Sequence, residues 1–148
     1  MRTASLAARN GYGKVYVYTD GLPDWEKHGY PVESDVTYPD TDIGTISGAE
    51  LREAIDAGAD LLVLDVRDAA DFALGRIGAA VNIALDDMQE RWEDLPRTRK
   101  IVLVDRHGKQ VRNSARYLAY RGLTNLAMLE KGFFGGWKDS GYPVEEGP

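Results

Sequence analysis

One short segment gathers most of the side chains that could do chemistry. It follows the apolar run 100–104 and precedes a stretch with helical apolar spacing, so we expect a loop between a buried strand and a helix. Successive backbone N–H groups in such a loop can point inward and, with the helix N-terminus, form a cradle for an anion. The candidate anion-binding residues are Asp105, Arg106, His107, Gly108, Lys109, Gln110 and Val111, with Arg112 as a supporting residue.

The acidic residue at the start of this loop leaves two interpretations open. The segment could be a polar connection with solvated charges. Alternatively, Asp105 points into the cradle and accepts hydrogen bonds from amides of residues 106–111, in which case its carboxylate repels a second anion. A carboxylate can also be a nucleophile towards phosphoryl or glycosyl centres, although it is a poor one towards sulfur.

Composition limits the classes of function. The chain has 148 residues, with 24 acidic and 18 basic side chains and a net charge of −6, which argues against general binding to nucleic acid or to anionic membranes. No apolar run approaches the roughly 18–20 residues of a membrane span, so we expect a soluble, cytoplasmic protein. The absence of cysteine excludes thiol nucleophiles and thiolate metal sites, and two histidines argue against zinc. We therefore expect no metal and no cofactor.

Short apolar segments alternate with helical patterns along most of the chain. The sequence 47–50 is a capping box that predicts a helix ending near Gly58. Continuous apolar runs predict strands covered on both faces, and such alternation is typical of an α/β fold with a parallel sheet and helices on both faces. Ligands of these folds bind beyond the carboxyl ends of the strands. The expected strands are 61–64, 80–83, 100–104 and 126–129, and the expected later helices are 68–72, 86–92 and 112–121.

The beginning of the chain resembles its end. Both blocks contain, in the same order, a glycine, an apolar segment, a second glycine, a tryptophan and the sequence Gly-Tyr-Pro-Val-Glu. Gly11 and Gly122 are 111 residues apart, and Gly29 and Gly141 are 112 apart, which is about one domain length. We interpret residues 1–34 as the C-terminal fragment of a preceding repeat, 35–41 as a linker and 42–148 as the complete domain.

Three motifs of the complete domain, in order, resemble the rhodanese family. The segment 65–67 is similar to its Asp-x-Arg motif, 71–83 to Glu-Phe-x-x-Gly-His-Ile-Pro-Gly-Ala-x-Asn-Ile, and 132–144 to its closing Gly-Gly-x-x-x-Trp…Gly-Tyr-Pro-Val pattern. The resemblance implies a rhodanese-like fold with a central parallel five-stranded sheet. Arg76 in place of His, and Gly78-Ala79 in place of Pro-Gly, make this a divergent member.

The family's active loop reads Cys-Arg-x-Gly-x-Arg, and its cysteine carries sulfur as a persulfide. Here the cysteine position is Asp105. The resemblance therefore implies a catalytically inactive member with a structural, interaction or anion-sensing role in a tandem arrangement, and sulfate, phosphate or thiosulfate as a candidate ligand. We expect Asp65 and Arg67 to brace the loop.

Two enzymatic alternatives stay open. A partner domain could supply the cysteine for sulfur transfer. Asp105 could instead act in phosphatase-like hydrolysis, with Val111 or Arg112 at the position of the arginine that clasps phosphate in related enzymes.

The N-terminal fragment raises a separate expectation about partners. Val15 to Tyr18 would be an apolar strand without neighbours, and such an edge tends to be covered. We expect residues 1–34 to pack on the complete domain or to form a homodimer.

Overall fold

The computed structural model describes residues 2–29 and 41–147. The chain divides into two compact units, Met1–Thr37 and Tyr38–Pro148. The first unit is called the amino-terminal unit below, and the second contains the complete domain.

The complete domain is built on a parallel sheet. Its strand order is β1-β5-β4-β2-β3, and every neighbouring pair is parallel. This confirms the expected α/β fold with a five-stranded parallel sheet. The expected strands are present, and β1 is a strand that the apolar pattern did not identify. The strands are β1 (Gly44–Ile46), β2 (Leu61–Asp65), β3 (Ala80–Asn82), β4 (Lys100–Val104) and β5 (Leu126–Leu129).

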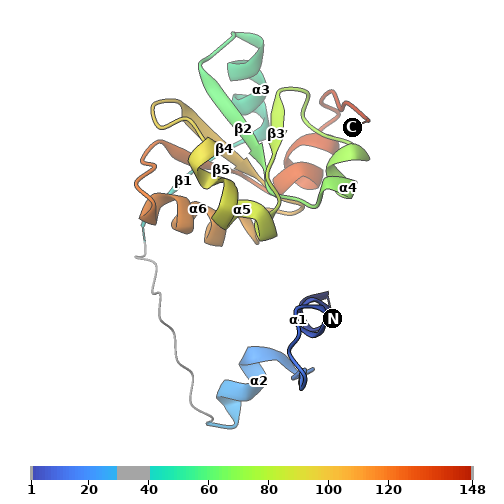
Figure 1. Ribbon diagram of the computed structural model, residues 1–148. Helices are drawn as coiled ribbons and strands as arrows, with labels where there is room; N and C mark the ends of the chain where they lie inside the picture. The colour runs from blue at the N-terminus through green and yellow to red at the C-terminus, as the bar shows by residue number, and fades with distance from the viewer. Residues whose placement is uncertain (1, 30–40, 148) are drawn as a thin grey trace. The chain divides into compact units, whose positions relative to one another are not determined.

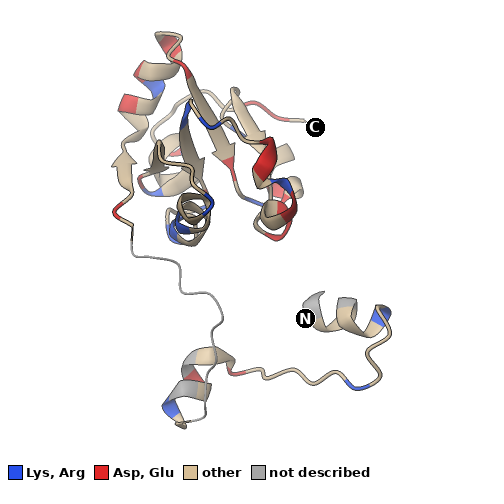
Figure 2. Ribbon diagram, turned by 60° about the vertical axis from the view of Figure 1, so that its left-hand side comes forward, with Lys and Arg blue, Asp and Glu red and all other residues tan. Residues whose placement is uncertain are grey.

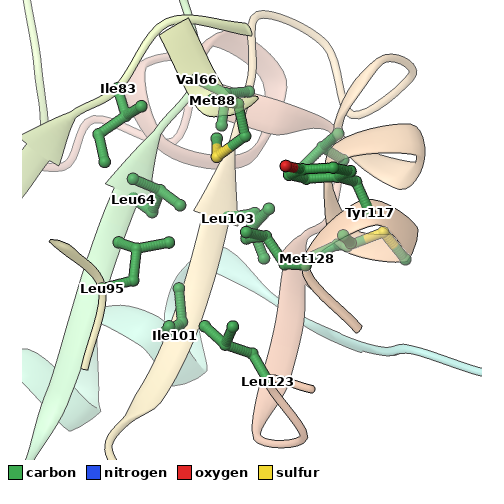
Figure 3. Close-up of a cluster of buried hydrophobic side chains, with 13 residues drawn as sticks. Leu64, Val66, Ile83, Met88, Leu95, Ile101, Leu103, Tyr117, Leu123 and Met128 are labelled. Atoms are coloured by element: carbon green, nitrogen blue, oxygen red, sulfur yellow. The ribbon is translucent and has the colours of Figure 1, made fainter. Parts of the chain in front are cut away.

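Helices cover both faces of this sheet (Figure 1). One buried cluster packs α5 and α6 against the strands, and Figure 3 shows Met88 and Tyr117 converging on Leu64 and Leu103. The other cluster joins α3 to the segment after β5. The helices are α3 (Gly48–Asp56), α4 (Ala69–Ala73), α5 (Met88–Arg91), α6 (Val111–Tyr120) and the π-helical turn η3 (Phe134–Lys138). None of the described helices is long and apolar enough to span a bilayer.

Local signals explain two boundaries of α3, and they locate the helical segment around α5 without its internal division. The Ser47 hydroxyl accepts a hydrogen bond from the Glu50 amide, and the Glu50 carboxylate accepts one from the Ser47 amide, as the capping box predicts. Gly58 follows the helix with a positive φ of 68°. The helix expected at 86–92 is present as a helical segment of three parts, in which the four residues of α5 lie between the 3₁₀ turns η1 (Leu85–Asp87) and η2 (Trp92–Asp94). Met88, the first residue of α5, and Leu95, which follows η2, are both buried.

The amino-terminal unit contains α1 (Arg2–Arg9) and α2 (Gly21–Lys27). The strand expected at Val15–Tyr18 is not formed, and all four side chains are exposed. The physical reason is that a strand needs a hydrogen-bonding neighbour, and the described residues of this unit provide none. The expected Gly-Tyr-Pro-Val-Glu tail after Gly29 and the linker up to residue 40 lie outside the described residues.

Candidate functional site

The candidate loop leaves the sheet at its centre. It follows β4, which pairs with β2 on one side and with β5 on the other. Because all three strands are parallel, the ends of β2 and β5 flank the start of the loop at the same edge of the sheet. The loop then enters α6 at Val111. This is the position at which ligands bind in parallel α/β sheets.

Asp105 fills the centre of the loop with its own side chain. The residue is 3% exposed. Its Oδ1 accepts a hydrogen bond from the Gly108 amide, and its Oδ2 accepts bonds from the amides of Gln110 at 2.7 Å and Val111 at 3.0 Å. The hydrogen bonds expected from the sequence are therefore present. The negative charge in this cradle belongs to the protein itself.

The segment after β5 closes the back of the loop. The amide of Phe133 donates to the Asp105 carbonyl at 2.7 Å, and the amide of Phe134 donates to the Arg106 carbonyl at 3.2 Å. Gly132 precedes them with a φ of 63°. A Cβ atom there would lie 2.6 Å from the Gly108 nitrogen and 2.7 Å from the Asp105 Oδ1, so this backbone approach requires glycine. The residue motifs did not identify this anchor, although Gly132 is one of the repeated glycines.

Asp65 and Arg67 form a buried pair beside this anchor. The Arg67 guanidinium donates to both Asp65 oxygens, with the shortest contact at 2.6 Å, and also to the Gly75 carbonyl at 2.7 Å. Its carbon Cζ lies 3.9 Å from the centre of the Phe133 ring. The pair thus contacts the residue whose amide holds Asp105. This arrangement fits the expected bracing role.

The basic residues of the loop are exposed, and one is neutralised. The Arg106 guanidinium forms an ion pair with Asp71, a partner that the sequence motifs did not suggest. The His107 ring stacks on Phe134, with 5.5 Å between centroids and 28° between planes. Figure 2 shows acidic and basic side chains interspersed over the complete domain.

A hollow of about 230 Å³ lies over the loop. Lys109 contributes to its wall, whereas Arg112 is exposed on the first turn of α6 and does not line it. The hollow is lined by Asp105, Arg106, His107, Lys109 and Gln110. Of the sequence-predicted residues, the structure thus brings these five together and leaves Arg112 outside.

Comparison with known proteins gives the family. A model of the rhodanese-like domain matches residues 47–139. The chain belongs to the rhodanese-like domain family. It is 34% identical over 85 residues to the putative sulfurtransferase YtwF of Bacillus subtilis. These aligned residues cover 57% of this chain and 82% of that protein. It is 24% identical over 102 residues to a sulfurtransferase of Allochromatium vinosum, over 69% of this chain and 94% of the relative.

A solved structure supports the same assignment. The rhodanese-related protein of Thermoplasma volcanium is 31% identical to this chain, with a TM-score of 0.62, over 69% of this chain and 97% of the other. In this rhodanese-like domain the position expected for the family's cysteine is occupied by Asp105, and the chain contains no cysteine at all.

Proposed function

We propose that this chain is a non-catalytic rhodanese-like domain that serves a structural, interaction or anion-sensing role in a tandem arrangement. The observation that carries the proposal is the Asp105 carboxylate held by three loop amides. Sulfur transfer through a persulfide needs a thiolate at this position, and the chain has none. An oxygen nucleophile has no stable persulfide equivalent.

The same geometry argues against the hydrolytic alternative. A nucleophilic carboxylate must reach the reacting centre with a free oxygen. Both Asp105 oxygens accept backbone hydrogen bonds, and the residue is buried. Arg112 lies outside the hollow, so a phosphate there would lack the arginine clasp that this alternative requires.

A partner domain that supplies a cysteine does not restore sulfur transfer at this loop. The persulfide of such a partner would carry negative charge towards a cradle whose amides already bind Asp105. Sulfur chemistry in a tandem protein therefore belongs to the other domain's own loop. This leaves a structural, interaction or sensing role for the domain described here.

The decisive experiment restores the thiol. The purified chain should show no transfer of sulfur from thiosulfate to cyanide above a control without protein, because no residue can hold the sulfur. Asp105→Cys places a thiol among the same amides and should form a persulfide, detected by mass spectrometry as one added sulfur atom, with measurable thiocyanate production. Asp86→Cys, at an exposed position outside the loop, is the matched control and should stay inactive. Turnover by the unmodified chain would overturn the proposal.

A further inference from the structure

The internal repeat extends from the sequence to the backbone of the amino-terminal unit. With the 111-residue offset, α1 corresponds to residues 113–120 of α6, and α2 begins opposite Gly132. Within α2 the offset becomes 112, so that Trp25 corresponds to Trp137 in the helical segment after β5. The repeated glycines also share left-handed φ angles. These are 89° at Gly11 and 92° at Gly122, 78° at Gly21 and 63° at Gly132, and 71° at Gly29 and 76° at Gly141.

Burial is the property in which the two copies differ. Val15–Tyr18 corresponds to β5, which lies between β1 and β4 in the complete domain. Ala127 and Met128 of β5 are 4% and 5% exposed, whereas their counterparts Tyr16 and Val17 are 88% and 52% exposed. The amino-terminal unit thus has the residues of a central strand without the two strands that would cover it. Such an apolar segment requires a cover.

We propose that residues 2–29 are the back half of a second rhodanese-like domain and dock into a front half that supplies equivalents of β1 and β4. Residues 15–18 then become the central strand of that domain. This inference rests on the tandem arrangement in the proposed function, and it names the kind of partner: a polypeptide that folds as the segment from β1 to the loop after β4.

The proposal also assigns a role to Gly21. Its counterpart Gly132 closes the loop at Asp105, where any Cβ would collide with loop amides. Gly21 shares the left-handed conformation of Gly132. In the second domain, Gly21 would therefore lie against the anion-cradle loop of the front half. The second site is composite, because its back wall comes from the amino-terminal unit.

A second copy of this chain does not provide the missing strands. In the complete domain the place between β1 and β4 is already filled by β5, through ladders on both sides. Residues 15–18 of another molecule would have to displace a covalently attached strand whose side chains are buried. A homodimer is therefore a competing outcome of the test, and its result would be distinct.

The test joins a front half to the whole chain. Residues 38–111 of this protein are placed directly ahead of Met1, because Arg112 corresponds to Met1 in the repeat. Hydrogen exchange of the amides at residues 14–18 is measured in the unmodified chain and in the fusion. Because residues 15–18 are exposed, this proposal replaces the packing or homodimer expected from the sequence: exchange should be as fast as in free peptide in the unmodified chain. In the fusion it should be at least about 100-fold slower, because new strands pair on both sides. Protection of β4 in the original domain verifies that the fusion protein is folded.

Two glycine variants make the test specific. In the fusion, Gly21→Val should abolish the protection of residues 14–18, because a β-branched residue opposes the left-handed φ and its Cβ meets the new loop. Gly13→Thr is the matched control: nothing lies within 4 Å of a Cβ there, and its counterpart is Thr124, so protection should persist.

Three results would overturn the proposal. They are fast exchange at residues 14–18 in a folded fusion, equal protection in both glycine variants, and a homodimer of the unmodified chain that already protects these amides. These readouts are independent of sulfur transfer. Sulfurtransferase activity in the unmodified chain would refute the inactive assignment at Asp105 and leave the exchange result standing.

Discussion

At the scale of single residues, the proposed function rests on a carboxylate, Asp105, at the position expected for the family's cysteine. By resemblance to the family, a thiolate or persulfide at this position would be stabilised by the loop amides and could exchange its sulfur. The Asp105 carboxylate accepts hydrogen bonds from such amides, at 2.7 Å from Gln110 and 3.0 Å from Val111. Unlike a persulfide, it has no atom that it can transfer. The loop is therefore already satisfied in the absence of any ligand.

Removing this internal charge should open the cradle to external anions. Asp105→Asn keeps the size of the side chain and removes its negative charge, so we expect sulfate, phosphate or thiosulfate to bind at least about 10-fold more tightly than to the unmodified chain. Isothermal titration calorimetry measures the affinities. Asp86→Asn makes the same change in net charge at an exposed position and should bind no better than the unmodified chain. Equal affinities in both variants would count against self-occupation.

The buried pair beneath the loop should matter more for stability than any exposed pair. Arg67→Met leaves the Asp65 carboxylate buried without its counter-ion and should lower the free energy of unfolding by about 3–5 kcal/mol. Arg52→Met breaks the exposed pair with Asp56 and should cost less than about 1 kcal/mol. Urea unfolding of the two variants compares these costs. Similar losses in both would show that the buried pair has no special role.

At the scale of elements, the capping box of α3 predicts a pH dependence. The Ser47 hydroxyl, followed by the Ser47 amide, holds the pKa of Glu50 below its ordinary value of 4.5. A lowered pKa in the folded state means that the carboxylate stabilises the fold fully above pH 4.5 and loses this effect as the pH falls through the lowered pKa.

The matching variant is Glu50→Gln, which does not titrate. Its stability deficit relative to the unmodified chain should be constant at neutral pH and should shrink as the pH falls below 4.5. Urea unfolding at several pH values gives the difference. Glu53→Gln, on the same helix and outside the capping box, is the control. A deficit in Glu50→Gln that grows in acid would contradict this account.

Elements with strong local signals could be predicted from the sequence. The continuous apolar runs of β2 and β4, the capping box before α3 and the apolar spacing of α6 each specify an element within a few residues. β1 carries no such signal, since it has three residues and only Ile46 is buried. Its position is set by pairing with β5, which is information from outside the segment. The exposed segment 15–18 is the opposite case: its sequence has the pattern of a strand, but no strand forms because no neighbouring strand among the described residues pairs with it.

The candidate site divides in the same way. The contact between Asp105 and the amides that follow it is local, so the loop pattern predicts it. The anchors from Gly132, Phe133 and the ion pair with Asp71 join residues far apart in the chain. No spacing rule within a single segment reveals such contacts.

At the scale of the whole molecule, the chain divides into two compact units, and we expect the complete domain to fold without the first. Among the described residues, the members of both buried clusters lie between Ile43 and Val144. A chain of residues 38–148 therefore keeps every buried apolar contact of these clusters. We expect it to fold cooperatively, with a urea midpoint equal to that of the full chain within error.

The full chain then serves as the comparison that separates the roles of its two units. Circular dichroism and analytical ultracentrifugation of both proteins should give one unfolding transition at the same midpoint, and the shorter protein should be a monomer. A truncated chain that unfolds or aggregates would show that the amino-terminal unit stabilises the complete domain. Residues 2–29 would then not be available to form part of a second rhodanese-like domain. A retained midpoint would mean that the exposed side chains of Tyr16 and Val17 contribute nothing to this domain, so their apolar surface is available to a partner.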